Sequence, residues 1–234
     1  MEYHGVVFDV DDTLYDMSLP FIGAYERLYE KRYDLPLAPL FLAFRRYSDA
    51  RFDDSQTGKM TMEELYIYRL RMAFRDYGVC ITDEEALDFQ HLYMQLQYRI
   101  QLSEVMRELL DALQERAALG IITNGDSMHQ RNKLRSLNIA QWVPQECIIV
   151  SGDHAFRKPD VQIFREMEHR LGLAPEHLVY VGDAFGLDVM GAKCAGWQSV
   201  WFNHRNRKRP DKTEVLPDIE VHTEDALAAL LLAV

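Results

Sequence analysis

Three carboxylates stand within four residues near the N-terminus, in the run Asp9-Val10-Asp11-Asp12-Thr13. In extended backbone the side chains of Asp9 and Asp11 lie on the same side of the chain, so their charges repel each other. Such repulsion raises the pKa of one carboxyl unless a cation compensates. Magnesium is a suitable cation, because it prefers oxygen ligands and completes its shell with water and phosphate. The run suggests a magnesium site, although a polar turn at the end of a strand has a similar composition.

A second polar segment, Thr123-Asn124-Gly125, follows the apolar pair Ile121-Ile122. A hydroxyl, an amide and the backbone N–H groups of such a segment can donate hydrogen bonds to a phosphate. The same three residue types also form ordinary turns, so this segment indicates a phosphate site only in the company of others.

Two further segments offer a cation and two more acids. Lys158 stands before Pro159, which fits the first turn of a helix, and its ammonium could neutralise charge on a nucleophile and a phosphate. Asp183 and Asp188 follow the apolar run 179–181. Asp183 could complete a metal site, and Asp188 could bind the metal through water or orient the other ligands. Taken alone, a lysine before a proline is more often a solvated surface residue than a functional one. Two acids after a strand are, taken alone, weak evidence for a metal site.

Short apolar runs with β-branched residues, each ending in a polar or glycine-rich turn, predict buried parallel strands. Helical patterns lie between them, and this alternation predicts a doubly wound parallel sheet, a Rossmann-like α/β core. In such sheets ligands bind beyond the carboxyl ends of the strands, where all four polar segments fall. The predicted strands are 6–10, 119–123, 147–150, 178–181 and 199–202, and the predicted helices are 103–117, 127–138, 160–172 and 185–195.

The stretch from about residue 20 to residue 100 is too long for a single crossover and contains no strand pattern. It predicts an inserted domain of about four helices. Two capping boxes, Thr61 with Glu64 and Thr82 with Glu85, indicate where two of these helices begin. The last apolar stretch, 226–234, is shorter than the roughly 20 residues that a membrane span needs and predicts a terminal amphipathic helix.

The 234 residues are 48% hydrophobic and 27% charged, which is the composition of an ordinary soluble globular protein. The formal net charge of -11 disfavours a nucleic acid polymer as partner. No export signal or membrane segment is recognised, so a cytoplasmic location is expected. The three cysteines, Cys80, Cys147 and Cys194, are odd in number and are expected to be reduced, in core or half-buried positions. The basic run 205–209 is expected to form a solvated loop.

Together the polar segments resemble the motif set of the haloacid dehalogenase-like (HAD) hydrolase superfamily. The DxDxT motif corresponds to residues 9–13, the second-motif Thr to Thr123, the third-motif Lys to Lys158, and the acidic fourth motif to Asp183 with Asp188. The layout is similar to phosphatases of the pyrimidine nucleotidase-like branch. The resemblance implies a Rossmann-like catalytic core at 1–15 and 101–234. It also implies a helical cap at 16–100, whose opening and closing would exclude water from the substrate.

The resemblance also implies a role for each site residue. Asp9 would be the nucleophile that forms a phosphoryl-aspartate, and Asp11 would be the general acid and base. Magnesium would be bound by Asp9, by the backbone carbonyl of Asp11 and by Asp183, with Asp188 in support. The implied catalytic set is Asp9, Asp11, Thr123 and Lys158; the phosphate-binding set is Thr123, Asn124, Gly125 and Lys158; the metal set is Asp9, Asp11, Asp183 and Asp188.

The expected activity is magnesium-dependent hydrolysis of a small phosphate monoester, such as a nucleotide or a sugar phosphate. A phosphomutase similar to β-phosphoglucomutase is the nearest alternative, since it shares the core motifs and returns the phosphoryl group to the sugar. A binding or regulatory module without catalysis is another, because a fold does not fix a function. The haloacid dehalogenases themselves lack the second Asp and use no magnesium, so dehalogenation is not expected. The sequence leaves the oligomeric state open.

Overall fold

The computed structural model describes residues 2–211 and 213–233. The chain forms two compact units. One contains the residues up to Asp16 together with those from Ile100 onward, and the other is Met17–Arg99. Every helix in the described residues is too short or too polar to cross a membrane.

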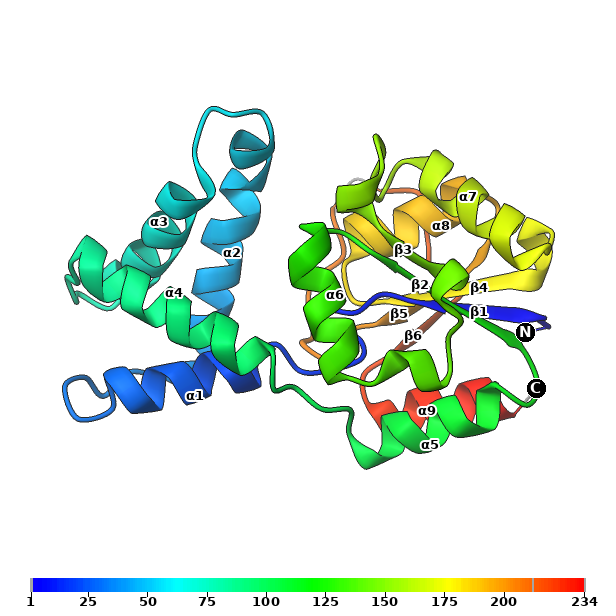
Figure 1. Cartoon of the computed structure of the whole chain (residues 1–234), viewed down its shortest axis with the longest axis horizontal. Helices are drawn as coiled ribbons and strands as arrows, with labels where there is room; N and C mark the ends of the chain where they lie inside the picture. The colour runs from blue at the N-terminus through cyan, green and yellow to red at the C-terminus, as the bar shows by residue number, and fades with distance from the viewer. Residues whose placement is uncertain (1, 212, 234) are drawn as a thin grey trace. The chain divides into compact units, whose positions relative to one another are not determined.

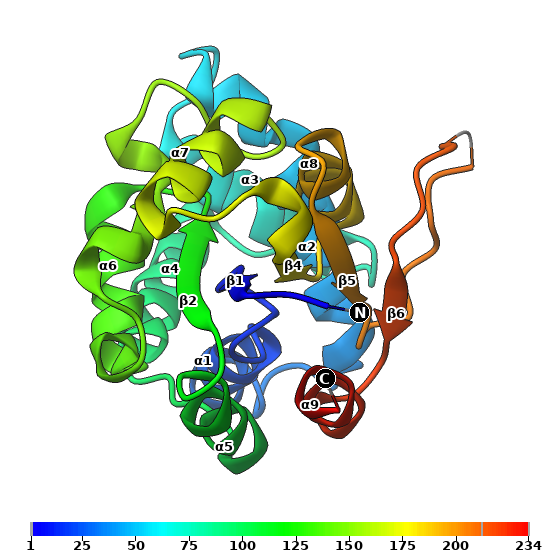
Figure 2. The same cartoon turned by 90° about the vertical axis from the view of Figure 1, so that its right-hand side faces the viewer.

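The larger unit is a parallel sheet with helices on both faces. Its strands are β1 (Gly5–Phe8), β2 (Ala118–Thr123), β3 (Ile148–Val150), β4 (Leu178–Gly182), β5 (Gln198–Phe202) and β6 (Ile219–Val221). Its helices are α5 (Glu104–Leu113), α6 (Ser127–Ser136), α7 (Val161–Leu171), α8 (Met190–Cys194) and α9 (Glu224–Leu232). The strand order over the described residues is β3-β2-β1-β4-β5-β6, with every pairing parallel. Figures 1 and 2 show α5 and α9 on one face and α7 and α8 on the other, so the predicted doubly wound sheet is confirmed.

Strand β6 was not predicted from the sequence, and one predicted helix is irregular. Strand β6 has only three residues, with exposed Glu220 at its centre, and it pairs with the single strand β5. It therefore lacks the continuous apolar run that marked the other strands. The helix predicted at 185–195 is a π-helical turn, Phe185–Val189, followed by the short helix α8.

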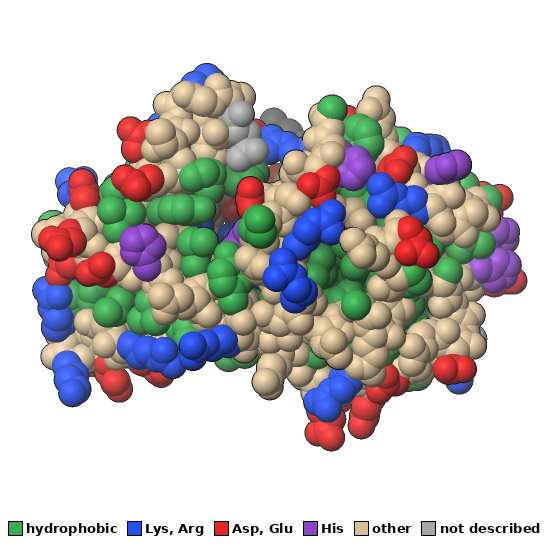
Figure 3. Space-filling view, viewed as in Figure 1, with side chains coloured by type: hydrophobic (Ala, Val, Ile, Leu, Met, Phe, Trp, Pro, Cys, Tyr) green, Lys and Arg blue, Asp and Glu red, His purple; other side chains and the backbone are tan. Residues whose placement is uncertain are grey.

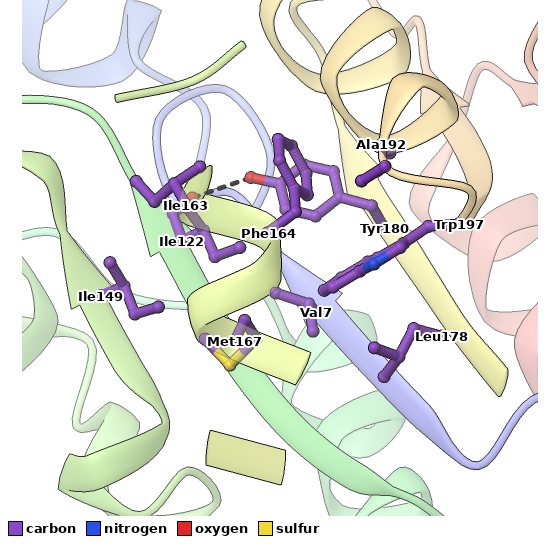
Figure 4. Close-up of a cluster of buried hydrophobic side chains, with 11 residues drawn as sticks. Val7, Ile122, Ile149, Ile163, Phe164, Met167, Leu178, Tyr180, Ala192 and Trp197 are labelled. Atoms are coloured by element: carbon purple, nitrogen blue, oxygen red, sulfur yellow. Dashed lines mark hydrogen bonds between the residues drawn. The ribbon is translucent and has the colours of Figure 1, made fainter. Parts of the chain in front are cut away.

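A cluster of buried side chains fixes the sheet against α7 (Figure 4). Phe164 of α7 meets Tyr180 of β4 and Trp197 edge to face, with ring centroids 5.3 and 5.4 Å apart. The hydroxyl of Tyr180 donates a hydrogen bond to the carbonyl oxygen of Ile122 at 2.8 Å. Aromatic pairs of this kind add to the free energy gained from burial. The cluster holds the ends of β2 and β4 in a fixed relation.

The smaller unit is helical. Over residues 17–99, whose backbone is fully described, its helices are α1 (Ser18–Leu28), α2 (Leu37–Gln56), α3 (Met62–Arg75) and α4 (Asp83–Gln97). Both predicted capping boxes are present, at Thr61 before α3 and at Thr82 before α4. Phe21 lies at the centre of the packing, with Phe41, Phe44 and Phe89 around it. These helices are thus held together mainly by buried aromatic side chains.

The expectation that all three cysteines are buried or half-buried was wrong for two of them. Cys147 is buried, but Cys80 and Cys194 are exposed. Cys80 lies between α3 and α4, outside regular structure. Cys194 is the last residue of α8, and its exposure comes with its place at the end of that helix.

Candidate active site

Lys158 is the centre of a buried hydrogen-bond network beyond the ends of the strands. Its ammonium donates to Asp9 Oδ1 at 2.7 Å, to Asp188 Oδ1 at 2.7 Å and to the Tyr180 hydroxyl at 2.8 Å. An ammonium has three donors, and each one therefore has an acceptor. The side chain of Lys158 is 2% exposed. Lys158 is thus not a solvated surface lysine but a fixed counter-charge to two acids.

Asn124 holds the backbone of Lys158 in place. Its Oδ1 accepts the N–H of Lys158 at 3.0 Å, and its Nδ2 donates to the carbonyl oxygen of Lys158 at 2.9 Å. The N–H of Gly125 donates to Ser151 Oγ at 3.0 Å. The side-chain amide of Asn124 and the N–H of Gly125 are therefore engaged within the protein. Thr123 differs, because its buried Oγ1 has no hydrogen-bond partner among the described residues.

Three buried carboxylates form a candidate metal centre. One oxygen from each of Asp9, Asp183 and Asp188 lies within 4.8 Å of the others. Burial raises the pKa of Asp9 to about 7; Lys158 opposes the shift, and the charges of Asp188 and Asp11 add to it. Burial likewise raises the pKa of Asp183 well above its ordinary value, although Arg207 opposes the shift. Crowded carboxylates that resist ionisation in this way fit a hard divalent cation, which prefers oxygen donors.

Asp188 is packed against the end of β4. Its Oδ1 accepts from Lys158, and its Oδ2 accepts the N–H of Ala184 at 2.8 Å. A Cβ at Gly182 would lie 2.4 Å from Asp188 Oδ2, so only glycine fits there. Both carboxylate oxygens of Asp188 therefore have partners, and one of these partners is Lys158.

The Asp11 carboxylate lies apart from this cluster and is held by four hydrogen bonds. Lys133 Nζ lies 2.8 Å from both of its oxygens, Gln130 Nε2 donates at 2.9 Å and the Tyr15 hydroxyl donates at 2.6 Å. Burial alone would raise the pKa of Asp11, but the Lys133 ammonium and these hydrogen bonds lower it well below its usual range. These contacts therefore favour the ionised form of Asp11. The sequence analysis missed Lys133 and Gln130, because a lysine and a glutamine three residues apart on a polar helix carry no local mark of function.

The expectation of a solvated basic loop at 205–209 was wrong for two of its arginines. Arg205 Nε and Nη2 donate to the two oxygens of Asp12 at 2.8 and 2.6 Å, and Arg205 also binds Asp16. Arg207 Nη1 donates to Asp183 Oδ2 at 2.7 Å. The acids that bind these arginines are about twenty to two hundred residues away in the sequence, so spacing could not reveal the pairs.

Arg205→Gln is expected to lower the free energy of unfolding by about 3 kcal/mol, because it leaves buried Asp12 without its bidentate partner. Urea denaturation of the two proteins at neutral pH measures the difference. Arg209→Gln is the matched control, since Arg209 is exposed in the same loop and surface changes usually fall within about 0.5 kcal/mol. Equal stability of both variants would show that the Asp12 pair contributes little.

Known proteins match the chain over most of its length. A family model for haloacid dehalogenase-like hydrolases matches residues 3–196. The HAD-hydrolase YfnB of Bacillus subtilis is 28% identical over 98% of this chain and 95% of its own. A crystal structure of YfnB bound to magnesium superposes with a TM-score of 0.74 at 25% identity, and the match covers 100% of both chains.

Two further relatives have named activities. The human N-acylneuraminate-9-phosphatase is 26% identical over 97% of this chain and 92% of its own. The pyrimidine 5'-nucleotidase PynA of Streptococcus pneumoniae is 24% identical over 98% of this chain and 96% of its own. The family expected from the four motifs is thus confirmed, and the chain belongs to the haloacid dehalogenase-like hydrolase family.

Proposed function

We propose that this enzyme hydrolyses a small phosphate monoester with magnesium, through a phosphoryl-aspartate on Asp9. The observation that carries the proposal is the position of Asp9, where strand β1 ends, with Lys158 Nζ at 2.7 Å and two further buried carboxylates beside it. The relatives named as phosphatases support the same reaction class. Residues 17–99 would then be the family's cap domain, and substrate selection is assigned to them.

Asp9 supplies the attacking oxygen. In the first step an Asp9 oxygen forms a bond to phosphorus, and the bond from phosphorus to the leaving oxygen breaks. The Lys158 ammonium beside Asp9 keeps the nucleophile close to a positive charge that also attracts the phosphate. The hydroxyl of Thr123, which has no hydrogen-bond partner among the described residues, is a donor available to a phosphate oxygen.

Asp11 is assigned the proton transfers. In the first step Asp11 would take the proton of the phosphate ester monoanion and pass it to the leaving oxygen. In the second step the ionised carboxylate would accept a proton from water, while that water attacks phosphorus and the bond to Asp9 breaks. The contacts to Lys133, Gln130 and Tyr15 favour the ionised form, which is the form needed for the second step.

Magnesium would be held by the carboxylates of Asp9 and Asp183 and by the backbone carbonyl of Asp11. When bound, it would supply positive charge to the phosphate oxygens and to these acids. The close grouping of oxygens from three buried carboxylates supports this assignment. Asp188 is close enough to take part, but its contacts to Lys158 and Ala184 assign it mainly to holding Lys158.

The test is phosphate release from a panel of nucleotide, sugar and cofactor monophosphates, with magnesium and with excess chelator. We expect release that requires magnesium. Transfer of the phosphoryl group between two positions of a sugar phosphate, without net release, would instead support a phosphomutase. An absence of both reactions over the whole panel would favour a binding module, and halide release from a haloacid would favour a dehalogenase.

Magnesium binding is expected to weaken as the pH falls through about 7. The pKa of Asp9 is raised to about 7 in the metal-free protein, so below that pH a proton competes with the metal for this carboxylate. Isothermal titration calorimetry at pH 6 and pH 8 measures the change in affinity and the protons released. An affinity that does not depend on pH over this range would argue against Asp9 as a ligand.

A further inference from the structure

Helix α6 presents two polar side chains to Asp11 from positions three residues apart. Gln130 and Lys133 are both buried, with 2% exposed surface each. Residues at this spacing lie on one face of a helix. On the same helix Arg135 is exposed and Arg131 is half-buried. Figure 3 shows Lys and Arg side chains at the surface over α6. Lys133 is thus buried, whereas Arg131 and Arg135 of the same helix are partly or fully exposed.

The start of α6 is built to bring this face to Asp11. The helix begins directly after the segment 123–125, and the Asp126 side chain caps it by accepting the N–H of His129 at 2.9 Å. Gly125 precedes the cap with a φ of 148°, and a Cβ there would lie 2.8 Å from Gln130 Nε2. Gln130 Nε2 also donates to the carbonyl oxygen of Asn124 at 3.1 Å. The same short segment therefore fixes Lys158, through Asn124, and Asp11, through α6.

Four hydrogen bonds from three side chains fill the Asp11 carboxylate. Oδ1 accepts from Lys133 and Tyr15, and Oδ2 accepts from Lys133 and Gln130. A carboxylate offers about four lone-pair sites, so none is left for a substrate or a water molecule. Proton transfer then requires one neutral donor to withdraw. Lys133, which contacts both oxygens with a full charge, is the contact suited to remain, because charge-assisted hydrogen bonds are the stronger ones.

We propose that Lys133, aided by Gln130, is the positioning residue that holds the Asp11 carboxylate in place for proton transfer. This rests on the proposed function, since it gives Asp11 the acid and base roles. The role assigned to Lys133 involves no contact with substrate or phosphate. Its effect on the reaction is through the position of Asp11. A carboxyl that is no longer held transfers a proton less well, even if more of it is protonated, because geometry comes before pKa in proton transfer. Lys133 should therefore matter most when the leaving group needs a proton.

Two substrates whose leaving groups differ in basicity can distinguish this positioning role from a merely structural one. p-Nitrophenolate departs as a stable anion, whereas phenolate is more basic and departs more readily with a proton. Phenyl phosphate and p-nitrophenyl phosphate have nearly the same shape, so their binding should respond alike to a change in the site. The ratio of their kcat/KM values reports the step in which the leaving group departs.

Lys133→Met is expected to lower kcat/KM for phenyl phosphate at least about 10-fold more than for p-nitrophenyl phosphate. The difference is a part of the rate enhancement of roughly 10² to 10⁴ that positioned proton transfer contributes. Lys133→Arg should restore most of the loss, because a guanidinium can also contact both oxygens. Arg131→Met is the matched control: it removes a cation from the same helix whose partner, Asp153, is outside the site. It should leave the ratio unchanged.

Equal losses with both esters, or no loss with either, would overturn the role of Lys133 while leaving the phosphatase reaction intact. If Lys133→Met fails to fold in a thermal melt, Gln130→Met takes its place and should show the same selective loss to a smaller extent. Equal effects of Gln130→Met on the two esters would then overturn the proposal. Wild-type protein that releases phosphate from no ester would overturn the proposed function itself, which is a different result.

Discussion

Asp9→Asn is expected to abolish phosphate release while the protein stays folded. The amide has nearly the shape of the carboxylate but cannot form the covalent bond to phosphorus, so turnover should fall by about 10⁴-fold to 10⁶-fold, the scale of losing a nucleophile. The variant should be at least as stable as wild type without magnesium. The reason is that Asp9 is buried with a raised pKa, so its charge is a cost to the folded state.

The measurement combines steady-state phosphate release with a thermal melt of each protein. Asp153→Asn is a suitable control, since Asp153 pairs with Arg131 at the surface, outside the candidate site. Rapid quenching of the wild type with labelled substrate should also trap acid-stable label on the protein, and Asp9→Asn should carry none. Normal turnover by Asp9→Asn would rule out the covalent mechanism.

The motif residues could be predicted from the sequence because a local pattern placed each of them. Asp9 follows a continuous apolar run, and Asp183 does the same. In a parallel sheet such positions meet at one edge, so knowledge of strand ends was enough to bring them together. In the structure, one carboxylate oxygen from each of Asp9, Asp183 and Asp188 lies within 4.8 Å of the other two.

The partners of these residues could not be predicted in the same way. Lys133 and Arg205 acquire their roles through pairing with acids more than a hundred residues distant. Tyr180 looked like an ordinary strand residue, yet its hydroxyl links Lys158 to the carbonyl oxygen of Ile122. No spacing rule indicates which of many lysines, arginines and tyrosines will face an acid after folding. The sequence also did not show that the side-chain amide of Asn124 would bind the backbone of Lys158, or that the N–H of Gly125 would bind Ser151.

Lys158→Met is expected to reduce kcat by about 10² to 10³, comparable to the loss of one preorganised donor to developing charge. Methionine has a similar length, so little cavity is created, but the ammonium that contacts Asp9 and Asp188 is lost. The effect should exceed that of Lys193→Met, which removes a half-exposed lysine paired with Asp218. Phosphate release by the three proteins at saturating substrate and magnesium measures it.

The pH dependence of Lys158→Met gives a second test, because Lys158 has two effects that respond differently to pH. Lys158 lowers the pKa of Asp9 against the effect of burial, so its removal should raise that pKa further above about 7. A carboxyl with a raised pKa is ionised only at higher pH, so the activity of the variant should recover in part as the pH rises. A loss that stays constant with pH would mean that Lys158 acts mainly on the phosphate and little on the ionisation of Asp9. The same activity in variant and wild type at every pH would remove Lys158 from the reaction altogether.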